Sequence, residues 1–317
     1  MESLLTIANQ IKNKDFFYII THSYPDGDAL GSSFALCRAL QKMGKHAKVM
    51  HENNLPEKFE FLNQYIENQT FEPKCVISVD LADTALLEPS LKKFQKNVDI
   101  CIDHHISNKN YANATFVDST AAAACEIIYE LIKLLGISID KPIANCLYVG
   151  ISTDTGCFKY SSTTAHTHLV AAELINSGAE IAEINENIFI IKPAKKIECE
   201  KIIYKNLELL CRGKLAITHI TTSEMQKIGI NDGELDGIAS IPVSIKGVDL
   251  GATIREKTDG TIKVSVRTSK NADANIFCAH FGGGGHSRAG GFNLKCNIED
   301  AKKLIIKKFT EVYKWTE

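Results

Sequence analysis

Short apolar runs alternate with segments of helical periodicity in the first half of the chain. Short, mainly apolar runs predict three buried strands, at residues 16–21, 75–79 and 98–102. Apolar residues at near-helical spacing predict helices at residues 28–43, 121–135, 143–151 and 163–176. Strands that alternate with helices are typical of a mostly parallel sheet flanked by helices. We therefore expect an α/β domain over residues 1–188.

The pattern changes in the second half. Residues 194–210 read as one long helical stretch, and we place a linker at residues 189–200, near its start. After it, strand-like runs occur at 215–220, 250–256, 262–268 and 291–294, and a final helix is expected at 299–313. Residues 201–317 are therefore expected to form a smaller α+β domain.

Composition and charge narrow the class of protein. The chain has 317 residues, of which 44% are hydrophobic and 23% charged, so it is rich enough in apolar residues to build two cores. Its formal net charge is −2. Proteins that bind long nucleic acids usually carry a strong basic excess, which this chain lacks. Any nucleic-acid substrate is therefore expected to be short.

The cysteines and the chain start indicate the compartment. The ten cysteines include no C-x-x-C pair, which argues against a zinc ribbon or a thioredoxin-like motif. The start shows no basic-then-apolar signal peptide, and no apolar run approaches the ~18 residues of a membrane helix. We expect reduced thiols, most of them in the cores, and a cytoplasmic protein without membrane contact.

Four polar clusters stand at the ends of buried runs. They contribute His22, Asp26 and Asp28; then Asp80; then Asp103, His104 and His105; and finally Asp154. A single aspartate in such a place is usually a helix cap or a turn residue. In open α/β sheets, however, ligands bind at the carboxyl edge of the strands, where several of these groups would meet.

Carboxylates gathered at one edge repel one another unless some are protonated or cations neutralise them. A mixed set of aspartate oxygens and histidine nitrogens suits Mn²⁺ and similar ions, whereas a thiolate-selected zinc site would contain cysteines. One aspartate can bridge two ions roughly 3.5–4 Å apart, the geometry of two-metal phosphate hydrolysis. The clusters therefore predict two divalent cations, with Mn²⁺ as the expected ion.

A glycine-rich motif marks the second half. Residues 281–291 read Phe-Gly-Gly-Gly-Gly-His-Ser-Arg-Ala-Gly-Gly, which taken alone could be a flexible linker. Because a histidine, an arginine and a strand-like segment follow directly, we favour a substrate site. In it, the backbone N–H groups of Gly283, Gly284 and Gly285 would cradle a phosphate. His286 and Arg267 would add charge-assisted hydrogen bonds.

With these residues, the chain resembles the DHH phosphoesterase superfamily, of which Asp103-His104-His105 is the signature, and the glycine motif resembles the associated DHHA1 domain. The resemblance spans about residues 5–315. It implies that His22, Asp26 and Asp80 hold one metal ion and that Asp28, Asp80, His104 and Asp154 hold the other. It also implies that His105 lies near the scissile phosphate, supported by Asp103, and that Arg267 binds a terminal phosphate.

The compact two-domain layout is similar to the oligoribonuclease and 3′-phosphoadenosine 5′-phosphate (pAp) phosphatase group, also called nanoRNases. The resemblance implies Mn-dependent hydrolysis of short oligoribonucleotides or pAp to mononucleotides. Stand-alone enzymes that act on cyclic-di-AMP or pApA have nearly the same layout and remain an alternative. A nucleotide sensor or an adaptor protein would be expected to lose metal ligands, and all six are present. The sequence is compatible with a homodimer and does not fix the oligomeric state.

Overall fold

The computed structural model describes residues 2–51, 55–231, 234–235 and 237–313. The chain divides into two compact units, residues 1–191 and residues 192–317, which we call unit 1 and unit 2.

Unit 1 is built on a five-stranded parallel sheet. The strand order is β2-β1-β3-β4-β5, and every neighbouring pair is parallel. The strands are β1 (Phe17–Ile20), β2 (Ala47–Met50), β3 (Cys75–Val79), β4 (Ile100–Asp103) and β5 (Ala114–Val117). The three strands predicted from apolar runs are confirmed as β1, β3 and β4, and they are consecutive in the sheet. Their carboxyl ends therefore share one edge.

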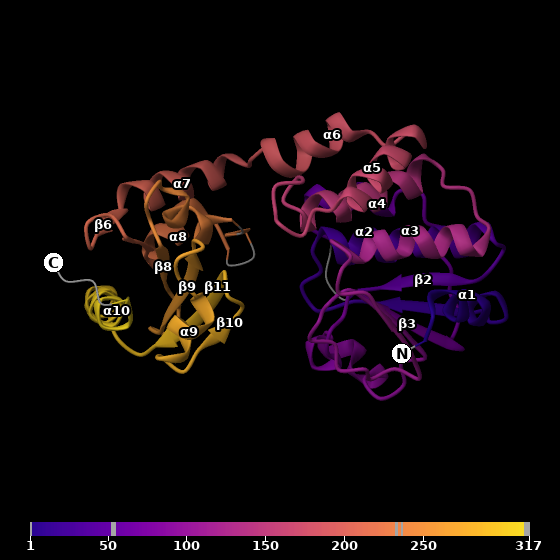
Figure 1. Ribbon diagram of the computed structural model, residues 1–317, viewed down its shortest axis with the longest axis horizontal. Coiled ribbons are helices and arrows are strands. Elements are labelled where there is room, and N and C mark those ends of the chain that lie inside the picture. Colours follow the sequence, from indigo (N-terminus) through magenta and orange to yellow (C-terminus); the bar gives the residue numbers. More distant parts are fainter. Residues whose placement is uncertain (1, 52–54, 232–233, 236, 314–317) are drawn as a thin grey trace. The chain divides into compact units, whose positions relative to one another are not determined.

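Helices α1 (Leu4–Lys12), α2 (Gly27–Lys42) and α3 (Ala124–Leu135) pack against one face of this sheet. Helix α4 (Lys141–Asp154) packs on α2 and α3, and α5 (Ala165–Asn176) and the short α6 (Ile181–Asn185) pack on α4, so these three form an outer layer (Figure 1). Alternate residues of β3 show the pleat. Cys75, Ile77 and Val79 join the core beneath the helices, whereas Val76 joins a smaller core on the other face. Short 3₁₀ segments, including η2 (Thr84–Leu86) and η3 (Pro89–Phe94), border that second core.

Unit 2 is a mixed sheet with helices. Its strand order is β10-β11-β9-β8-β7-β6, in which only β7 and β8 are parallel. The strands are β6 (Glu208–Leu210), β7 (Leu215–Ile220), β8 (Leu250–Glu256), β9 (Ile262–Thr268), β10 (Gly284–Gly285) and β11 (Ala289–Leu294). The helices are α7 (Ala194–Lys205), α8 (Thr222–Ile228), α9 (Ala274–Ala279) and α10 (Ile298–Tyr313). The expected α+β class is confirmed.

The predicted helix at 194–210 is too long. Helix α7 ends at Lys205, and residues 208–210 instead form β6, which pairs antiparallel with β7. Residues 194–200 lie inside α7, whose Cys199 is buried in a unit 2 core, so this part of the predicted linker belongs to unit 2. Packing against β7, which local periodicity does not reveal, accounts for both differences.

Most of the cysteines behave as small core residues. Cys37, Cys75, Cys101, Cys125 and Cys146 are buried in unit 1, and Cys199 and Cys278 are buried in unit 2. In the portion of the chain that the structure describes, none of the helices has the length and apolar character required to cross a membrane.

Candidate metal centre and phosphate site

Loops that leave three adjacent strands bring most of the predicted metal ligands together. His22 follows β1, Asp80 follows β3, and His104 follows β4. Three overlapping groups have ligand atoms within 4.8 Å of one another: His22, Asp26 and Asp80; Asp28, His104 and Asp154; and Asp80, His104 and His105. All six side chains predicted as metal ligands thus lie in one cluster, and His105 joins them.

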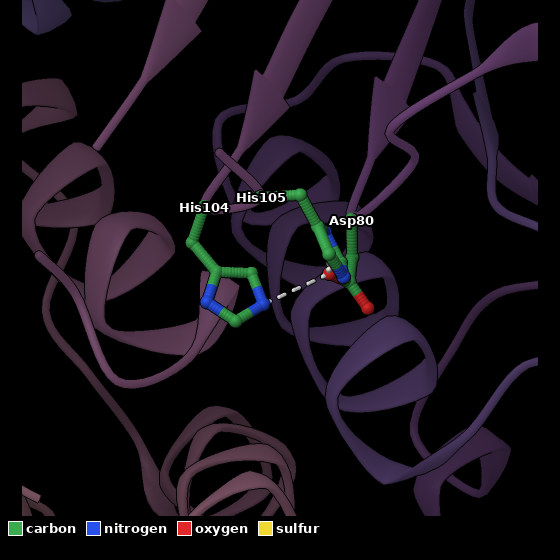
Figure 2. Close-up of side chains that lie close together, drawn as sticks. All are labelled: Asp80, His104 and His105. Atoms are coloured by element: carbon green, nitrogen blue, oxygen red, sulfur yellow. Dashed lines mark ion pairs between the residues drawn. The ribbon is translucent and has the colours of Figure 1, made fainter. Parts of the chain in front are cut away.

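Asp80 occupies the middle of this cluster. Its backbone has the left-handed φ of 53°, and its N–H donates to the carbonyl of Ile102 on the neighbouring strand. The side chain is buried, yet its Oδ1 has no hydrogen-bond partner. Ion pairs of 3.4 Å join Oδ1 to His104 Nε2 and to His105 Nδ1, and the two imidazoles face this carboxylate in Figure 2. A buried carboxylate oxygen without a donor is well suited to a cation.

Asp28 is fully buried in the first turn of α2, and its carboxylate also binds the N-terminus of a second helix, α3. Its two oxygens accept hydrogen bonds from the backbone N–H groups of Ala124, at 2.6 Å, and Cys125, at 2.9 Å. These donors open α3, whose N-cap residue Ala123 provides no side-chain cap. The amide dipoles of α3 therefore stabilise the negative charge of Asp28 in a buried place.

Glycines allow this approach of the helices. A Cβ at Gly31 of α2 would lie 2.3 Å from the carbonyl oxygen of Cys146 in α4. A Cβ at Gly150 of α4 would lie 2.7 Å from Asp28 Oδ1 and 2.2 Å from Cys125 Sγ. Close packing of α2 against α4 brings Asp28 near Asp154, the last residue of α4.

Asp26 and His22 complete the edge of the cluster. Asp26 is the N-cap of α2, and its Oδ1 accepts hydrogen bonds from the backbone N–H groups of Asp28 and Ala29, both at 3.1 Å. The helix cap and the metal-ligand interpretation are compatible here, because the carboxylate has a second oxygen. Burial lowers the pKa of His22, so its imidazole favours the neutral form that binds a metal ion.

The two histidines of the signature are oriented by different partners. His104 Nδ1 lies 3.3 Å from the carbonyl oxygen of Ala121, while its Nε2 lies 3.4 Å from an oxygen of Asp154. His105 Nδ1 lies 2.8 Å from Asp103 Oδ1. A ring N–H donated to a carbonyl or a carboxylate fixes the tautomer and leaves the other nitrogen as an acceptor. For His104 that nitrogen is Nε2, which faces the carboxylates.

Asp103 supports both histidines through its buried carboxylate. Oδ1 also accepts from the backbone N–H of His104 at 2.8 Å, and Oδ2 accepts from Asn108 Nδ2 at 2.6 Å. Burial acts to raise the pKa of Asp103, but the hydrogen bonds from His105 and Asn108 outweigh it and hold the pKa below its ordinary value. Asp103 is therefore an ionised anchor for His105.

Burial and neighbouring charges shift the pKa values of the remaining carboxylates and of His104. Burial, followed by the charge of Asp80, raises the pKa of Asp28 to about 7. Burial also raises the pKa of Asp80 to about 6 and that of Asp154 to about 8. Burial acts to lower the pKa of His104, but Asp80, Asp28 and Asp154 together raise it to about 10. The cluster thus favours bound positive charge, which protons or metal ions can supply.

These observations test whether divalent cations fit. The donors are carboxylate oxygens and imidazole nitrogens with no thiolate among the predicted ligands, and Asp80 Oδ1 has no hydrogen-bond donor. Two of the three ligand groups contain Asp80 and two contain His104, so the groups share ligands and form one connected cluster. The residues fit a hard or borderline divalent cation.

The glycine motif of unit 2 forms a tight hairpin. Gly284 and Gly285 pair antiparallel with Gly291 and Gly290, and the His286 N–H donates to the carbonyl of Ala289 at 2.7 Å. A Cβ at Gly283 would lie 2.2 Å from Gly291 O, and one at Gly285 would lie 2.3 Å from Ala289 O. The glycines are needed here for close backbone contact.

Several N–H groups of the predicted phosphate cradle make hydrogen bonds within unit 2. The N–H of Gly283 donates to the carbonyl of Cys278 at 3.0 Å, and that of Gly285 donates to Asn275 Oδ1 at 3.1 Å. The N–H groups of Gly282 and His286 are also engaged within the unit. These N–H groups therefore contribute to the fold of unit 2, and the assignment of Gly283, Gly284 and Gly285 to a substrate phosphate stays a prediction.

The side chains of the predicted phosphate site lie beside the hairpin. Arg267 pairs with Ala289 across β9 and β11, and its Nη1 donates to the carbonyl of Val266 at 3.0 Å. His286 is exposed in the hairpin turn. The strand pairing therefore brings Arg267 and the His286–Ala289 turn to the same end of the sheet in unit 2.

Sequence reasoning missed two supports of the metal centre. One is Asn108, which binds Asp103, and the other is the carbonyl of Ala121, which binds His104. An asparagine five residues after Asp103 is a weak signal on its own, and a backbone carbonyl gives none. Both contacts depend on how the loops fold, which the sequence pattern does not show.

Comparisons with known proteins agree with this architecture. Residues 16–151 match the model of the DHH family, N-terminal domain, and residues 213–314 match that of the DHHA1 domain. A Thermus thermophilus protein named bifunctional oligoribonuclease and PAP phosphatase NrnA is 30% identical, over 93% of this chain and 89% of its own. A Streptococcus mutans protein named as a probable enzyme of the same kind is 29% identical, over 92% and 94%.

A solved structure has the same fold along nearly the whole chain. The exopolyphosphatase-related protein from Bacteroides fragilis superposes with a TM-score of 0.88 at 24% identity, covering 98% of this chain and 97% of that one. The two domain models, the identity to the Thermus protein and this superposition agree on both units. The chain belongs to the DHH family, with an N-terminal DHH domain and a C-terminal DHHA1 domain.

Proposed function

We propose that this protein is a Mn²⁺-dependent phosphoesterase that hydrolyses short oligoribonucleotides, pAp or both to mononucleotides. The observation that carries the proposal is the cluster of seven aspartate and histidine side chains around Oδ1 of Asp80, a buried oxygen that accepts no hydrogen bond. The names of the Thermus and Streptococcus relatives support the substrate class. The net charge of −2 accords with a short substrate rather than a long one.

The ligand groups would divide between two ions. His22, Asp26 and Asp80 would hold one ion, and Asp28, His104 and Asp154 the other. Asp80 also groups with His104, which supports the assignment of Asp80 as a ligand shared by both ions. Divalent cations bound there would supply Lewis-acid chemistry, lowering the pKa of water and neutralising charge on the phosphoryl oxygens. The protein fixes their surroundings through α3, which binds Asp28, and through Ala121, which orients His104.

His105 is the side chain we assign to the phosphate itself. Its Nδ1 is bound to Asp103, which raises the pKa of the imidazole, so that a protonated His105 can donate from Nε2 to a phosphoryl oxygen. A donor fixed in advance by its partners stabilises charge that develops in the transition state. In unit 2, we assign Arg267 and His286 to a second phosphate of the substrate.

The test compares substrates and metal states. The wild type should turn over pAp or a five-nucleotide RNA with Mn²⁺, lose activity after chelation, and regain it when Mn²⁺ is added. Cyclic-di-AMP and pApA belong in the same panel, because preferential turnover of either would redirect the substrate assignment. Full activity of the verified metal-free protein would contradict the metal-dependent mechanism.

The Asp80→Ala variant sharpens this test. Loss of the Asp80 carboxylate disturbs both proposed ion sites, so we expect a fall in kcat on the order of 10³-fold or more, with reduced Mn²⁺ content. The control is Asp259→Ala, which removes an exposed turn carboxylate of unit 2 that binds only Thr261. Near-normal kinetics in a folded, metal-loaded Asp80→Ala protein would argue against a bridging carboxylate.

A further inference from the structure

Each of three loops that carry or follow the metal ligands exposes one large apolar side chain. Tyr24 lies between His22 and Asp26 and is 86% exposed. Ile106 directly follows His105 and is 92% exposed, and Leu86, in the loop that begins at Asp80, is 50% exposed. The three loops leave β1, β4 and β3, which are neighbours in the sheet. The edge that holds the charged centre therefore also presents exposed apolar side chains.

The backbone around Tyr24 is held firmly. The N–H of Ser23 donates to the carbonyl of Leu86 at 2.8 Å, which ties the first loop to the second. Pro25 restricts Tyr24 to extended conformations, and Asp26 then caps α2. Within the described part of the chain, the Tyr24 side chain makes no hydrogen bond and no aromatic contact that would stabilise the fold. The protein therefore presents a free ring on a fixed backbone.

The position of the Tyr24 ring limits which part of a ligand it can contact. Tyr24 is two residues from His22 and two from Asp26, so its Cα lies within about 8 Å of the Cα of each. A ligand whose phosphate reaches the metal centre carries its remaining groups past this loop. A nucleotide has one large flat apolar group, the base, and proteins that bind unpaired nucleotides commonly stack the base on an aromatic ring.

We propose that Tyr24 is the stacking residue for the base of the nucleotide whose phosphate lies at the metal centre, with Leu86 and Ile106 as apolar neighbours. This inference rests on the proposed function and adds a base-binding subsite to unit 1. The ring is already positioned, so binding orders few additional groups, which favours affinity. Because stacking accepts every base, the subsite selects nucleotides over other phosphate esters without reading sequence.

The experiment measures binding of AMP and of ribose 5-phosphate to the full-length protein with Mn²⁺ by calorimetry. Stacking of one base contributes about 1–3 kcal/mol, so wild type should bind AMP about 5- to 150-fold more tightly than ribose 5-phosphate. Tyr24→Ala and Tyr24→Leu should lose that preference while ribose 5-phosphate binding stays unchanged. Tyr24→Phe and Tyr24→Trp should retain it, because they keep an aromatic face.

Two further measurements separate stacking from a general surface effect. Tyr204→Ala removes another exposed tyrosine, on α7 of unit 2, and should leave both affinities unchanged. In Tyr24→Trp, AMP should quench the added indole fluorescence and ribose 5-phosphate should not, with wild type reporting the background of its own tryptophan.

The inference fails if Tyr24→Ala retains the preference for AMP, or if it lowers the affinities for AMP and ribose 5-phosphate equally. These outcomes differ from failure of the proposed function, in which wild type hydrolyses none of the nucleotide substrates. A wild type that hydrolyses pAp or short RNA with a Tyr24→Ala variant of unchanged KM would contradict the stacking role alone.

Discussion

The Nδ1 atom of His105 lies 2.8 Å from Oδ1 of Asp103, and this contact connects the half-buried last residue of the signature to its fully buried first residue. Asp103 is the last residue of β4, so the rigid sheet determines where the imidazole lies. Asn108 holds the other carboxylate oxygen at 2.6 Å. The orientation of His105 therefore depends on a residue that touches none of the proposed metal ligands directly.

Asn108→Ala should impair turnover without emptying the metal sites. It leaves Asp103 Oδ2 without its donor, and loss of such supporting contacts typically costs about 10–100-fold in activity. We expect the change in kcat rather than in KM, with Mn²⁺ content preserved. Asn113→Ala, an exposed asparagine at the start of β5, is the matched control. Equal effects of the two variants on kcat would contradict the role given to Asn108.

Stability of the metal-free protein should fall as pH rises. The folded-state pKa values of Asp28, Asp80 and Asp154 are raised to about 7, 6 and 8, so folding favours their protonated forms. That stability is present below the ordinary aspartate pKa of about 4 and is lost as pH rises through 6 to 8. His104, with a pKa raised to about 10, loses stability in the same direction between about pH 6.5 and 10.

Thermal unfolding with and without Mn²⁺ measures this effect. Between pH 5 and pH 9, the Tm of the chelated protein should fall by ~10 °C more than that of the loaded protein, given a few kcal/mol of lost stability. Asp28→Asn removes one of the raised groups and should flatten the metal-free profile. Parallel profiles for the chelated and loaded proteins would show that the carboxylate cluster does not govern this dependence.

Arg267→Ala tests the role of unit 2. Removing one partner of a desolvated charged hydrogen bond costs about 2–5 kcal/mol, which lowers kcat/KM for pAp by roughly 30-fold to several thousand-fold. The small ester bis-p-nitrophenyl phosphate has no second phosphate for Arg267, so its hydrolysis should change far less. His286→Ala should follow the same pattern. Lys263→Ala, which removes the same charge from the other end of β9, controls for net charge. Equal losses with both substrates would place unit 2 in the chemical step itself.

Gly285→Ala tests the hairpin as a structural element. Gly285 has a φ of 147°, and a Cβ there would lie 2.3 Å from Ala289 O. We expect the free energy of unfolding of unit 2 to fall by about 1–3 kcal/mol, measured by denaturant titration. Gly284→Ala is the matched control, because its Cβ would meet only Asn275 Oδ1 at 3.7 Å and should change stability by less than ~0.5 kcal/mol. Similar stability of both variants would show that a flexible glycine linker describes the hairpin better.

Elements with strong local patterns could be predicted from the sequence. The run Cys-Val-Ile-Ser-Val predicts β3 with its observed bounds, because both faces of that strand are buried. Strands β2 and β5 were not predicted, because they are four-residue edge strands without long apolar runs and exist through pairing with β1 and β4. Predictions therefore failed where distant pairing, rather than local pattern, determines the structure.

Helix α3 and the ligand cluster show the same limit. The helix was predicted from residue 121 but begins at Ala124, because Asp28, almost a hundred residues earlier, takes the first N–H groups. The six proposed ligands could be found because aspartates and histidines after apolar runs are visible in sequence. Their supports, the Ala121 carbonyl and Asn108, depend on loop paths that only the folded chain reveals.

The absent side chain of Gly150 has an evolutionary consequence. Any Cβ at this position would meet Cys125 Sγ at 2.2 Å and Asp28 Oδ1 at 2.7 Å, so a mutation there displaces the carboxylate of a proposed metal ligand on another helix. Selection on the reaction should therefore act on a residue whose own chemistry contributes nothing to it. During divergence, positions 28, 125 and 150 should accept substitutions only in combination, and a single codon change at Gly150 should be purged as efficiently as one at a ligand.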